Sequence, residues 1–159
     1  MAKAKHAIPE GYRTVTPALV LDDASAAIDW YKKALGAEEV TRSLGPDGKI
    51  MHAEIRVGDS RVMVNDAVMG LKSAKDLGGS PMSLWLYVED CDALFKRAVA
   101  AGAQVGMPLG DMFWGDRFGS IVDPFGYRWS IATHKEDLTP DEIKEREAAW
   151  MKQMGAAAP

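Results

Sequence analysis

The chain has 159 residues, 47% of them hydrophobic and 26% charged, which is ordinary for one globular domain. Its formal net charge of -4, without a run of lysines and arginines, argues against nucleic acid as a partner. No apolar stretch approaches the roughly 20 residues that a membrane helix needs, and the amino end lacks the apolar centre of a signal peptide. The single cysteine, Cys91, cannot form an internal disulfide. We therefore expect a cytoplasmic protein with no membrane partner.

Two segments of the chain, residues 16–40 and 83–105, resemble each other. Each has an alternating strand, an acidic pair suited to capping a helix, an amphipathic helix and a terminating glycine. The acidic pairs are Asp22-Asp23 and Glu89-Asp90, and the glycines are Gly36 and Gly102. Strand-like runs separated by turns follow each helix. The sequence therefore predicts an α+β fold made of two βαβββ modules.

The alternation within the strands separates two faces of each predicted sheet. The apolar face, expected to pack against a helix, holds Met51, Ala53, Ile55 and Val57 in the first module. The opposite face holds His52, Glu54 and Arg56 in the first module and Ser83, Trp85 and Tyr87 in the second. We expect these opposite faces, brought together from both modules, to line a cup.

Residues 138–154 carry complete start signals for a separate helix. Thr139 is suited to be the N-cap, Pro140 stands in the first turn, and Glu142 completes a capping box. Apolar positions are sparse, so we expect this helix on the surface of the body or of a partner subunit. The whole chain then divides into a flexible amino end (1–10), a first module (11–68), a connector (69–81), a second module (82–135) and a C-terminal helix with its tail (136–159).

Three motifs carry a family resemblance: VTPALVLDDASAAIDWYKKALGAEE, PDGKIMHAEI and WGDRFGSIVDPFGYRWSIATH. With the repeat, they resemble the vicinal-oxygen-chelate superfamily of glyoxalases, bleomycin resistance proteins and dioxygenases, and within it the PhnB-like or glyoxalase-like branch. The resemblance implies a curved mixed sheet built from two βαβββ modules, and a homodimer that completes the cups. It implies less about function, because this fold hosts metal isomerases, dioxygenases, thiol transferases and metal-free drug-binding proteins.

In metal-dependent members, the resemblance implies ligands near the start of the first strand of each module and in the strand after the Asp-Pro-x-Gly turn. Here the corresponding places hold Thr16, Ser83, Ser130 and Met63. Hydroxyls and a thioether suit a divalent ion poorly, since such ions prefer imidazole and carboxylate in these sites. We therefore expect no metal centre and no cofactor.

His52 and Glu54 are the first pair of candidate site residues. They lie two residues apart on one strand and therefore on one face. There the carboxylate would raise the pKa of the imidazole toward that of a usable base. Three interpretations stay open: acid–base catalysis, hydrogen bonding to a ligand, and a polar pair whose members satisfy each other.

Arg117 is the candidate for recognising an anion. Counting five residues back from Val57 gives His52, and five back from Val122 gives Arg117, which predicts Arg117 on the corresponding side of the cup. An arginine there would hold a carboxylate or phosphonate through its planar fork. The alternatives are an ion pair with the adjacent Asp116 and a capping contact to loop carbonyls.

Aromatic residues supply the remaining candidates. Trp85, Tyr87, Phe113 and Trp114 fall either on the cup face or on the loop that leads into the last hairpin. They provide either a stacking surface for a planar ligand or ordinary core packing. Tyr127 and Trp129 alternate with Ser130, and we expect both to face the helix as core residues.

These observations favour a metal-free small-molecule-binding protein of the glyoxalase/bleomycin-resistance type, which works as a homodimer on an aromatic, anionic ligand. The expected ligand-binding residues are His52, Glu54, Trp85, Tyr87, Trp114 and Arg117. One alternative is a glyoxalase-like lyase or isomerase with a non-standard metal or acid–base site, for which His134 is a further candidate. Another is a structural or regulatory protein that acts through its C-terminal helix.

Overall fold

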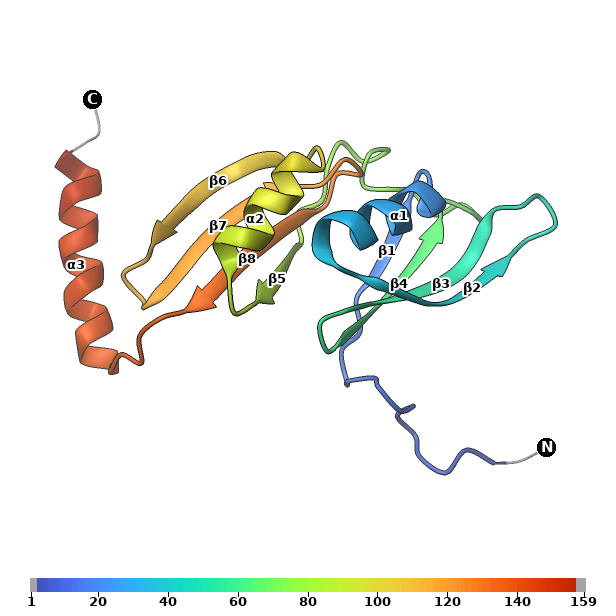
Figure 1. Cartoon of the computed structure of the whole chain (residues 1–159), viewed down its shortest axis with the longest axis horizontal. Coiled ribbons are helices and arrows are strands. Elements are labelled where there is room, and N and C mark those ends of the chain that lie inside the picture. The colour runs from blue at the N-terminus through green and yellow to red at the C-terminus, as the bar shows by residue number, and fades with distance from the viewer. Residues whose placement is uncertain (1–2, 157–159) are drawn as a thin grey trace.

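The structure is a computed structural model that describes residues 3–156. Figure 1 shows two modules side by side along the long axis, with the C-terminal helix α3 (Pro140–Ala156) beyond the second module. Each module is a four-stranded sheet with one helix packed on it. Of the predicted flexible ends, residues 1–2 and 157–159 lie outside the described residues.

The first module contains one helix and a sheet with both parallel and antiparallel pairs. Its strands have the order β1-β4-β3-β2, in which β1 pairs with β4 in parallel and the other pairs are antiparallel. The elements are β1 (Ala18–Leu21), α1 (Ala24–Leu35), β2 (Glu38–Leu44), β3 (Ile50–Val57) and β4 (Ser60–Asp66).

The second module repeats this topology element by element. Its strands have the order β5-β8-β7-β6, and β5 pairs with β8 in parallel. This correspondence confirms the predicted α+β fold of two βαβββ units. The elements are β5 (Ser83–Tyr87), α2 (Cys91–Ala100), β6 (Gln104–Asp111), β7 (Asp116–Val122) and β8 (Arg128–His134).

The predicted N-caps and the terminating Gly36 are confirmed, whereas the C-cap of α2 is Ala101, one residue before the predicted Gly102. The Asp23 carboxylate accepts a hydrogen bond from the Ala26 N–H at 2.9 Å, and the Asp90 carboxylate accepts one from the Ala93 N–H at 2.9 Å. Each bond satisfies an N–H group that the first helical turn leaves unpaired. Gly36 ends α1 with a φ of 69°, in the left-handed region that suits glycine.

A buried carboxylate joins the two modules. Asp123, in the turn between β7 and β8, accepts hydrogen bonds from the Tyr31 hydroxyl of α1 and from Trp129 Nε1, both at 2.8 Å. Burial raises the pKa of Asp123. Trp129 is fully buried and Tyr127 is 7% exposed, which confirms both as core residues. The cluster therefore ties the first helix to the last hairpin.

The expected apolar face of β3 is wrong at its first residue. Met51 is 38% exposed, and Ile50 is buried instead. A register shift between Ser43 and Leu44 of β2 accompanies this change. The backbone N–H of Ile50 donates to Asp66 at 2.7 Å, which fixes the start of the strand inside the module.

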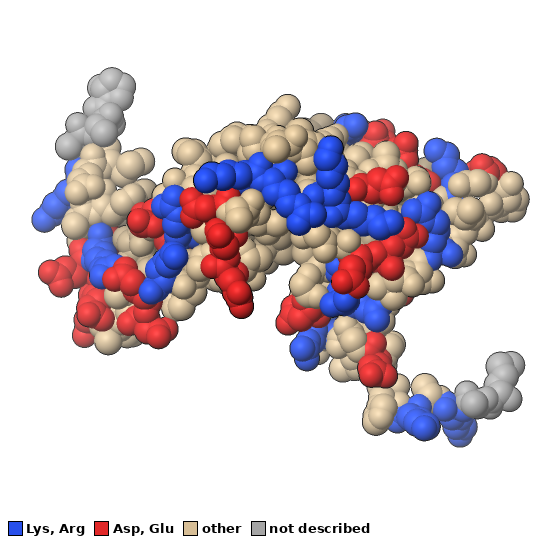
Figure 2. Space-filling view, in the orientation of Figure 1, with Lys and Arg blue, Asp and Glu red and all other residues tan. Residues whose placement is uncertain are grey.

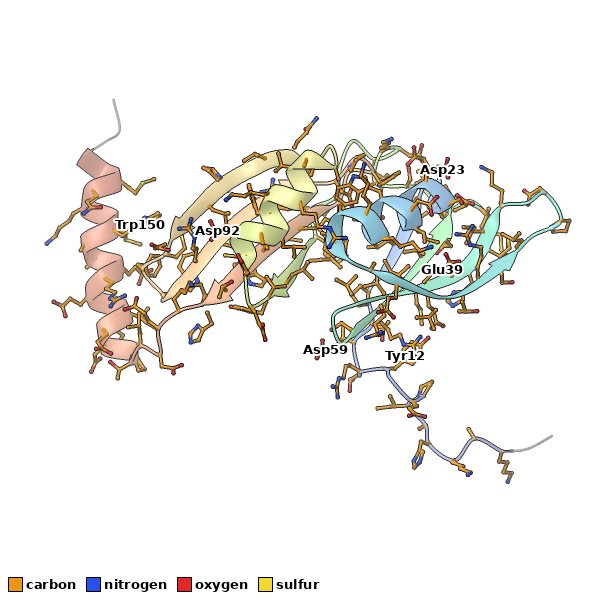
Figure 3. All side chains as sticks on the ribbon, viewed as in Figure 1. Tyr12, Asp23, Glu39, Asp59, Asp92 and Trp150 are labelled. Carbon is orange, nitrogen blue, oxygen red and sulfur yellow. The ribbon has the colours of Figure 1, made fainter. Side chains whose placement is uncertain are left out.

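Helix α3 begins as predicted and stands apart from the sheets (Figure 1). The Thr139 N–H donates to the Glu142 carboxylate at 2.8 Å, and the Glu142 N–H donates to the Thr139 hydroxyl at 3.3 Å, which is the capping box. The helix runs to Ala156, beyond the predicted end at residue 154. Figure 3 shows Trp150 on the side of α3 that faces the body, where its ring lies 5.6 Å from that of Phe113.

The fold gathers basic residues that the sequence keeps apart. Figure 2 shows Lys and Arg side chains together over α1 and α2. Arg97 of α2 donates to the backbone carbonyls of Lys33 at 2.6 Å and Lys32 at 3.1 Å. These bonds satisfy carbonyls at the end of α1, where a positive charge also suits the helix dipole. None of the helices within residues 3–156 is long and apolar enough to cross a membrane.

Candidate functional site

A pocket of about 330 Å³ lies where the two modules meet, and we call it the seam pocket. It is bounded by the segment before β1, by the hairpin between β3 and β4, and by β5. Its apolar lining comes from both modules and consists of Val15, Pro17, Val57, Val62, Met82, Leu84, Trp85, Leu86 and Trp129. Such a mainly apolar enclosure is typical of sites for small organic molecules.

Two arginines line the seam pocket. Arg61 of β4 forms an ion pair with Glu54 at 3.2 Å, and its guanidinium carbon lies 5.5 Å from the centre of the Tyr12 ring. Arg13 forms no ion pair within residues 3–156. The hydroxyls of Thr16, Ser60 and Ser83 complete the polar lining. The pocket therefore has positive charge and hydrogen-bond donors beside an apolar floor.

Aromatic side chains from β5, from β7 and from the loop before β7 form what we call the aromatic wall: Trp85, Tyr87, Trp114 and Phe118. Trp85 stacks on Phe118 with ring centres 4.7 Å apart and planes 8° apart. Tyr87 lies 6.1 Å from Trp85, and Trp114 lies 6.0 Å from Phe118. Trp85 is 44% exposed and Tyr87 is 63% exposed, so much of this surface is open to a further molecule.

A buried carboxylate holds the wall in place. Asp116 accepts hydrogen bonds from the Tyr87 hydroxyl at 2.9 Å, from Trp114 Nε1 at 2.9 Å and from His134 Nδ1 at 2.7 Å. Burial raises the pKa of Asp116, but the three hydrogen bonds together lower it by more, so the pKa lies below its ordinary value. The bonds of His134 to Asp116 and then to Asp137 raise the pKa of its imidazole.

His52 and Glu54 come together as the sequence predicts. His52 Nε2 lies 3.2 Å from the Glu54 carboxylate, which also pairs with Arg61. The pKa of Glu54 is lowered, first by the hydrogen bond from Tyr12 and then by the one from His52, although burial opposes this shift. Neither His52 nor Glu54 lines the seam pocket. The pair therefore reaches the pocket only through Arg61.

The predicted position of Arg117 is wrong. Its guanidinium bonds the Asp92 carboxylate of α2 at 2.6 and 2.9 Å and Asp111 at 3.2 Å, while its neighbour Phe118 faces the aromatic wall. Figure 3 shows Asp92 on α2, on the helix side of the sheet. The strong pairing raises the pKa of Arg117, first through Asp92.

The prediction for Arg117 fails because it treats Val57 and Val122 as equivalent positions, although the turns that follow these two residues differ in length. Val57 pairs with Ser60 across a tight turn, whereas Val122 pairs with Arg128 across a longer one. Val57 is buried at the end of β3, whereas near the end of β7 the fully buried residue is Ile121, one position before Val122. A shift of one residue moves every side chain to the other face.

Several residues of the site escaped the sequence reasoning. Phe118 and Asp116 alternate with Arg117 in β7, so a correct face assignment would have found both. Arg13 lies in the segment before the first strand, where no local pattern indicates a site. Trp85, Tyr87 and Trp114, in contrast, are brought together as expected.

The positions that the family resemblance assigns to metal ligands hold hydroxyl and thioether side chains in this chain. The Ser83 and Ser130 hydroxyls lie 2.8 Å apart and bond each other. Within residues 3–156, His, Cys, Asp and Glu side chains form no group of three that is suited to a metal ion. Together with Thr16 and Met63, these donors do not fit a divalent cation.

Comparisons with known proteins agree with this architecture. A protein of Mycobacterium tuberculosis (strain H37Rv), Rv0887c, is 45% identical over 135 residues, covering 82% of this chain and 79% of that protein. The crystal structure of TioX from Micromonospora sp. ML1 superposes with a TM-score of 0.64 at 29% identity, covering 77% of this chain and 98% of TioX. A PhnB protein from Bacillus cereus shares the fold, with a TM-score of 0.61 at 22% identity, covering 76% of this chain and 99% of that one.

The match to a family model covers most of both modules. The model is described as the Glyoxalase/Bleomycin resistance protein/Dioxygenase superfamily, and it matches residues 13–131. That range contains all eight strands except the last residues of β8, together with helices α1 and α2. The chain therefore belongs to the Glyoxalase/Bleomycin resistance protein/Dioxygenase superfamily.

Proposed function

We propose that this protein binds a small, aromatic and anionic molecule in the seam pocket without a metal ion. The observation that carries the proposal is the position of Trp85 beside Arg13 and Arg61 in one pocket of about 330 Å³. That volume lies within the range of about 300–1,000 Å³ that is usual for small-molecule sites. The two arginines take the role that the sequence assigned to Arg117.

The charges support an acidic ligand although the whole chain is acidic. A guanidinium attracts an anion more strongly where protein replaces water, because the local dielectric constant is lower there. Arg13 has no competing carboxylate within 4.0 Å in the described chain, and Arg61 shares Glu54 with His52. The partly exposed ring of Trp85 offers a planar surface in the same pocket as both arginines.

A homodimer is part of the proposal. Val105 and Met107 on β6 leave apolar surface open outside the seam pocket. A second copy would cover such surface and close the cup, as symmetric dimers commonly do. Sedimentation at micromolar concentration should give twice the chain mass of 17.3 kDa. A monomer at that concentration would count against this part. The single, buried cysteine suits a cytoplasmic location.

One observation favours an enzyme as the second candidate. His134 is oriented by the buried Asp116 at 2.7 Å, an arrangement that serves acid–base catalysis in many sites. A lyase or isomerase of this kind would turn over its substrate. His134→Gln would abolish that turnover but leave ligand binding in the seam pocket unchanged.

Ligand binding is tested with a matched pair of probes, indole-3-acetate and its neutral amide. Calorimetry should show that Arg13→Ala and Arg61→Ala each weaken binding of the acid by about 1–3 kcal/mol, the usual scale for a charged hydrogen bond. Binding of the amide should change little. Arg56→Ala is the control, because Arg56 is a half-exposed arginine on β3 that does not line the pocket.

Trp85→Ala should weaken binding of the acid and of the amide to the same extent, since both ligands stack on the ring. A preference for cationic or purely aliphatic molecules would contradict the proposal. Equal binding of the acid by the wild type and both arginine variants would also contradict it.

A further inference from the structure

The strand β5 has one edge without a partner strand. It is the end strand of its sheet, and among the strands of residues 3–156 it pairs only with β8. In a parallel pair, the N–H and C=O of alternate residues point to the same neighbour. The Val88 N–H donates to the backbone carbonyl of Ala132 in β8. The backbone N–H and C=O groups of the even-numbered residues of β5 therefore point toward β8. The backbone groups of Trp85 and Tyr87 therefore point to the free edge, and they form no hydrogen bond within residues 3–156.

The corresponding edge of β1 is different. The backbone groups of Pro17 and Leu21 bond to β4 and the residue after it, so Val20 faces the free edge. There the Tyr127 hydroxyl accepts from the Val20 N–H at 3.1 Å and donates to the Val20 carbonyl at 2.9 Å. One side chain thus fills the place of a partner strand in the first module. Nothing comparable within the described chain covers Trp85 and Tyr87.

The free edge of β5 lies along a groove. The seam pocket follows residues 82–86, and a second pocket of about 450 Å³ follows residues 85–88. The hairpin between β3 and β4 lines both pockets with Val57 and Ser60. Figure 3 shows Asp59 at the tip of this hairpin, between the two modules. An extended chain that enters the groove would therefore meet unpaired backbone groups along its length.

We propose that the ligand of the seam pocket is a short peptide that adds to β5 as an extra strand. This inference rests on the proposed function and specifies the ligand class of the same site. Unpaired N–H and C=O groups at an accessible edge are the features that such strand addition uses. From Ser83 to Tyr87 the edge spans about 13 Å at roughly 3.3 Å per residue, which suits a peptide of about three residues.

The charges along the groove give the peptide a direction. Arg13 and Arg61 line the pocket beside the first half of β5, whereas Asp59 lines the pocket beside the second half. A peptide with its carboxylate near the arginines and its amine near Asp59 runs antiparallel to β5. Its aromatic side chain would then stack on Trp85, as the proposed aromatic ligand does.

The test uses the tripeptide Ala-Phe-Ala and two analogues that carry one backbone N-methyl group, on the second or on the third residue. Only alternate residues of an added strand face the edge, so only one of the two N–H groups pairs with β5. One analogue should therefore bind about tenfold more weakly, and the other should bind within about twofold of the parent. Because the probe is modified and the protein is not, folding of the protein does not enter the result.

End groups test the direction. Amidation of the peptide carboxylate should weaken binding about tenfold in the wild type, and this difference should become smaller in Arg13→Ala and in Arg61→Ala. Acetylation of the amine should weaken binding in the wild type but not in Asp59→Asn. Equal effects of both N-methyl groups, or no effect of either, would overturn strand addition.

The controls separate the two proposals. If indole-3-acetate binds but the two N-methylated peptides do not differ in affinity, the peptide ligand is refuted. The seam pocket then remains a site for aromatic acids. Absence of binding by either class of probe would refute both. Peptide affinity should not depend on protein concentration, and an affinity that falls as concentration rises would identify a second copy as the occupant instead.

Discussion

The two modules share one topology and differ in the chemistry of the sheet face that no helix covers. In the first module this face carries His52, Glu54 and Arg61 in a network of ion pairs. In the second it carries the aromatic wall, supported by the buried Asp116. The helix-packed faces of both sheets are mostly apolar because they form the core, and Arg117, paired with Asp92, is an exception in the second module. The opposite faces are not constrained by the core, and this freedom allows one module to supply charge and the other to supply stacking surface.

The two helices differ in how many of their residues are buried. Seven of the residues of α1 are buried, but only Cys91, Phe95 and Ala98 are buried in α2. Helix α1 contacts its own sheet and also the last hairpin through Tyr31 and Asp123. The first helix therefore reaches the last hairpin as well as its own sheet, and the second helix reaches the first module through Arg97, which donates to the backbone carbonyls of Lys32 and Lys33.

The largest expected effect comes from breaking the joint that Asp123 makes between the modules. Asp123→Ala should destabilise the protein by about 3–5 kcal/mol, since it leaves the buried donors of Tyr31 and Trp129 unpaired at about 1–3 kcal/mol each. Chemical denaturation would measure the change. Asp29→Ala, at an exposed position of α1, is the control and should cost less than about 0.5 kcal/mol. A similar result for both variants would show that the modules do not depend on this joint.

An intermediate effect is expected from pH at the edge of the aromatic wall. Asp116 and then Asp137 raise the pKa of His134 above its ordinary value of 6.5, so folding favours the charged imidazole. The stability that His134 contributes is therefore fully present below that ordinary value and is lost as pH rises through the raised pKa. NMR titration should show the raised pKa, and Asp116→Asn should lower it more than Asp137→Asn does.

Thermal melting of the wild type and His134→Gln gives a second measurement of the same linkage. The difference in melting temperature between them should shrink as pH rises. A difference that grows with pH would mean that the neutral imidazole is the stabilising form.

The smallest effect is expected in the first module. His52 is 43% exposed in its side chain, and its pair with Glu54 is of the kind that contributes little in water. His52→Gln should therefore change stability by less than about 0.5 kcal/mol and leave the affinity for indole-3-acetate unchanged. Glu54→Gln is the matched comparison, and it should cost more because it also weakens the contact with Arg61. A large loss of affinity in His52→Gln would bring this pair into the binding site.

The parts of the fold that depend on local signals could be predicted from the sequence. Helix caps at Asp23 and Asp90, the capping box at Thr139 and the doubling of the βαβββ unit all follow from residues that are close in the chain. The side-chain direction of Arg117 could not be predicted by comparing the modules, because the two hairpins differ in turn length.

The site itself depends on partners that are distant in the chain. Asp123 and Tyr31 are 92 residues apart, and Asp116 collects donors from β5, β8 and its own loop. Arg13 reaches the seam pocket from the segment before the first strand. Periodicity reports which face a residue occupies within one element, but it carries no information on which elements become neighbours.

The hydroxyl of Tyr127 on the edge of β1 also bears on aggregation. An open strand edge is a template on which another protein chain can pair, and proteins commonly block such edges with charge, proline or a covering loop. Here a phenol oxygen that both accepts and donates does this at Val20, inside a joint that the core already requires. Protection of the first sheet against unwanted intermolecular β-pairing thus comes from an atom of the second module, so the first module would lose this protection if it were expressed alone.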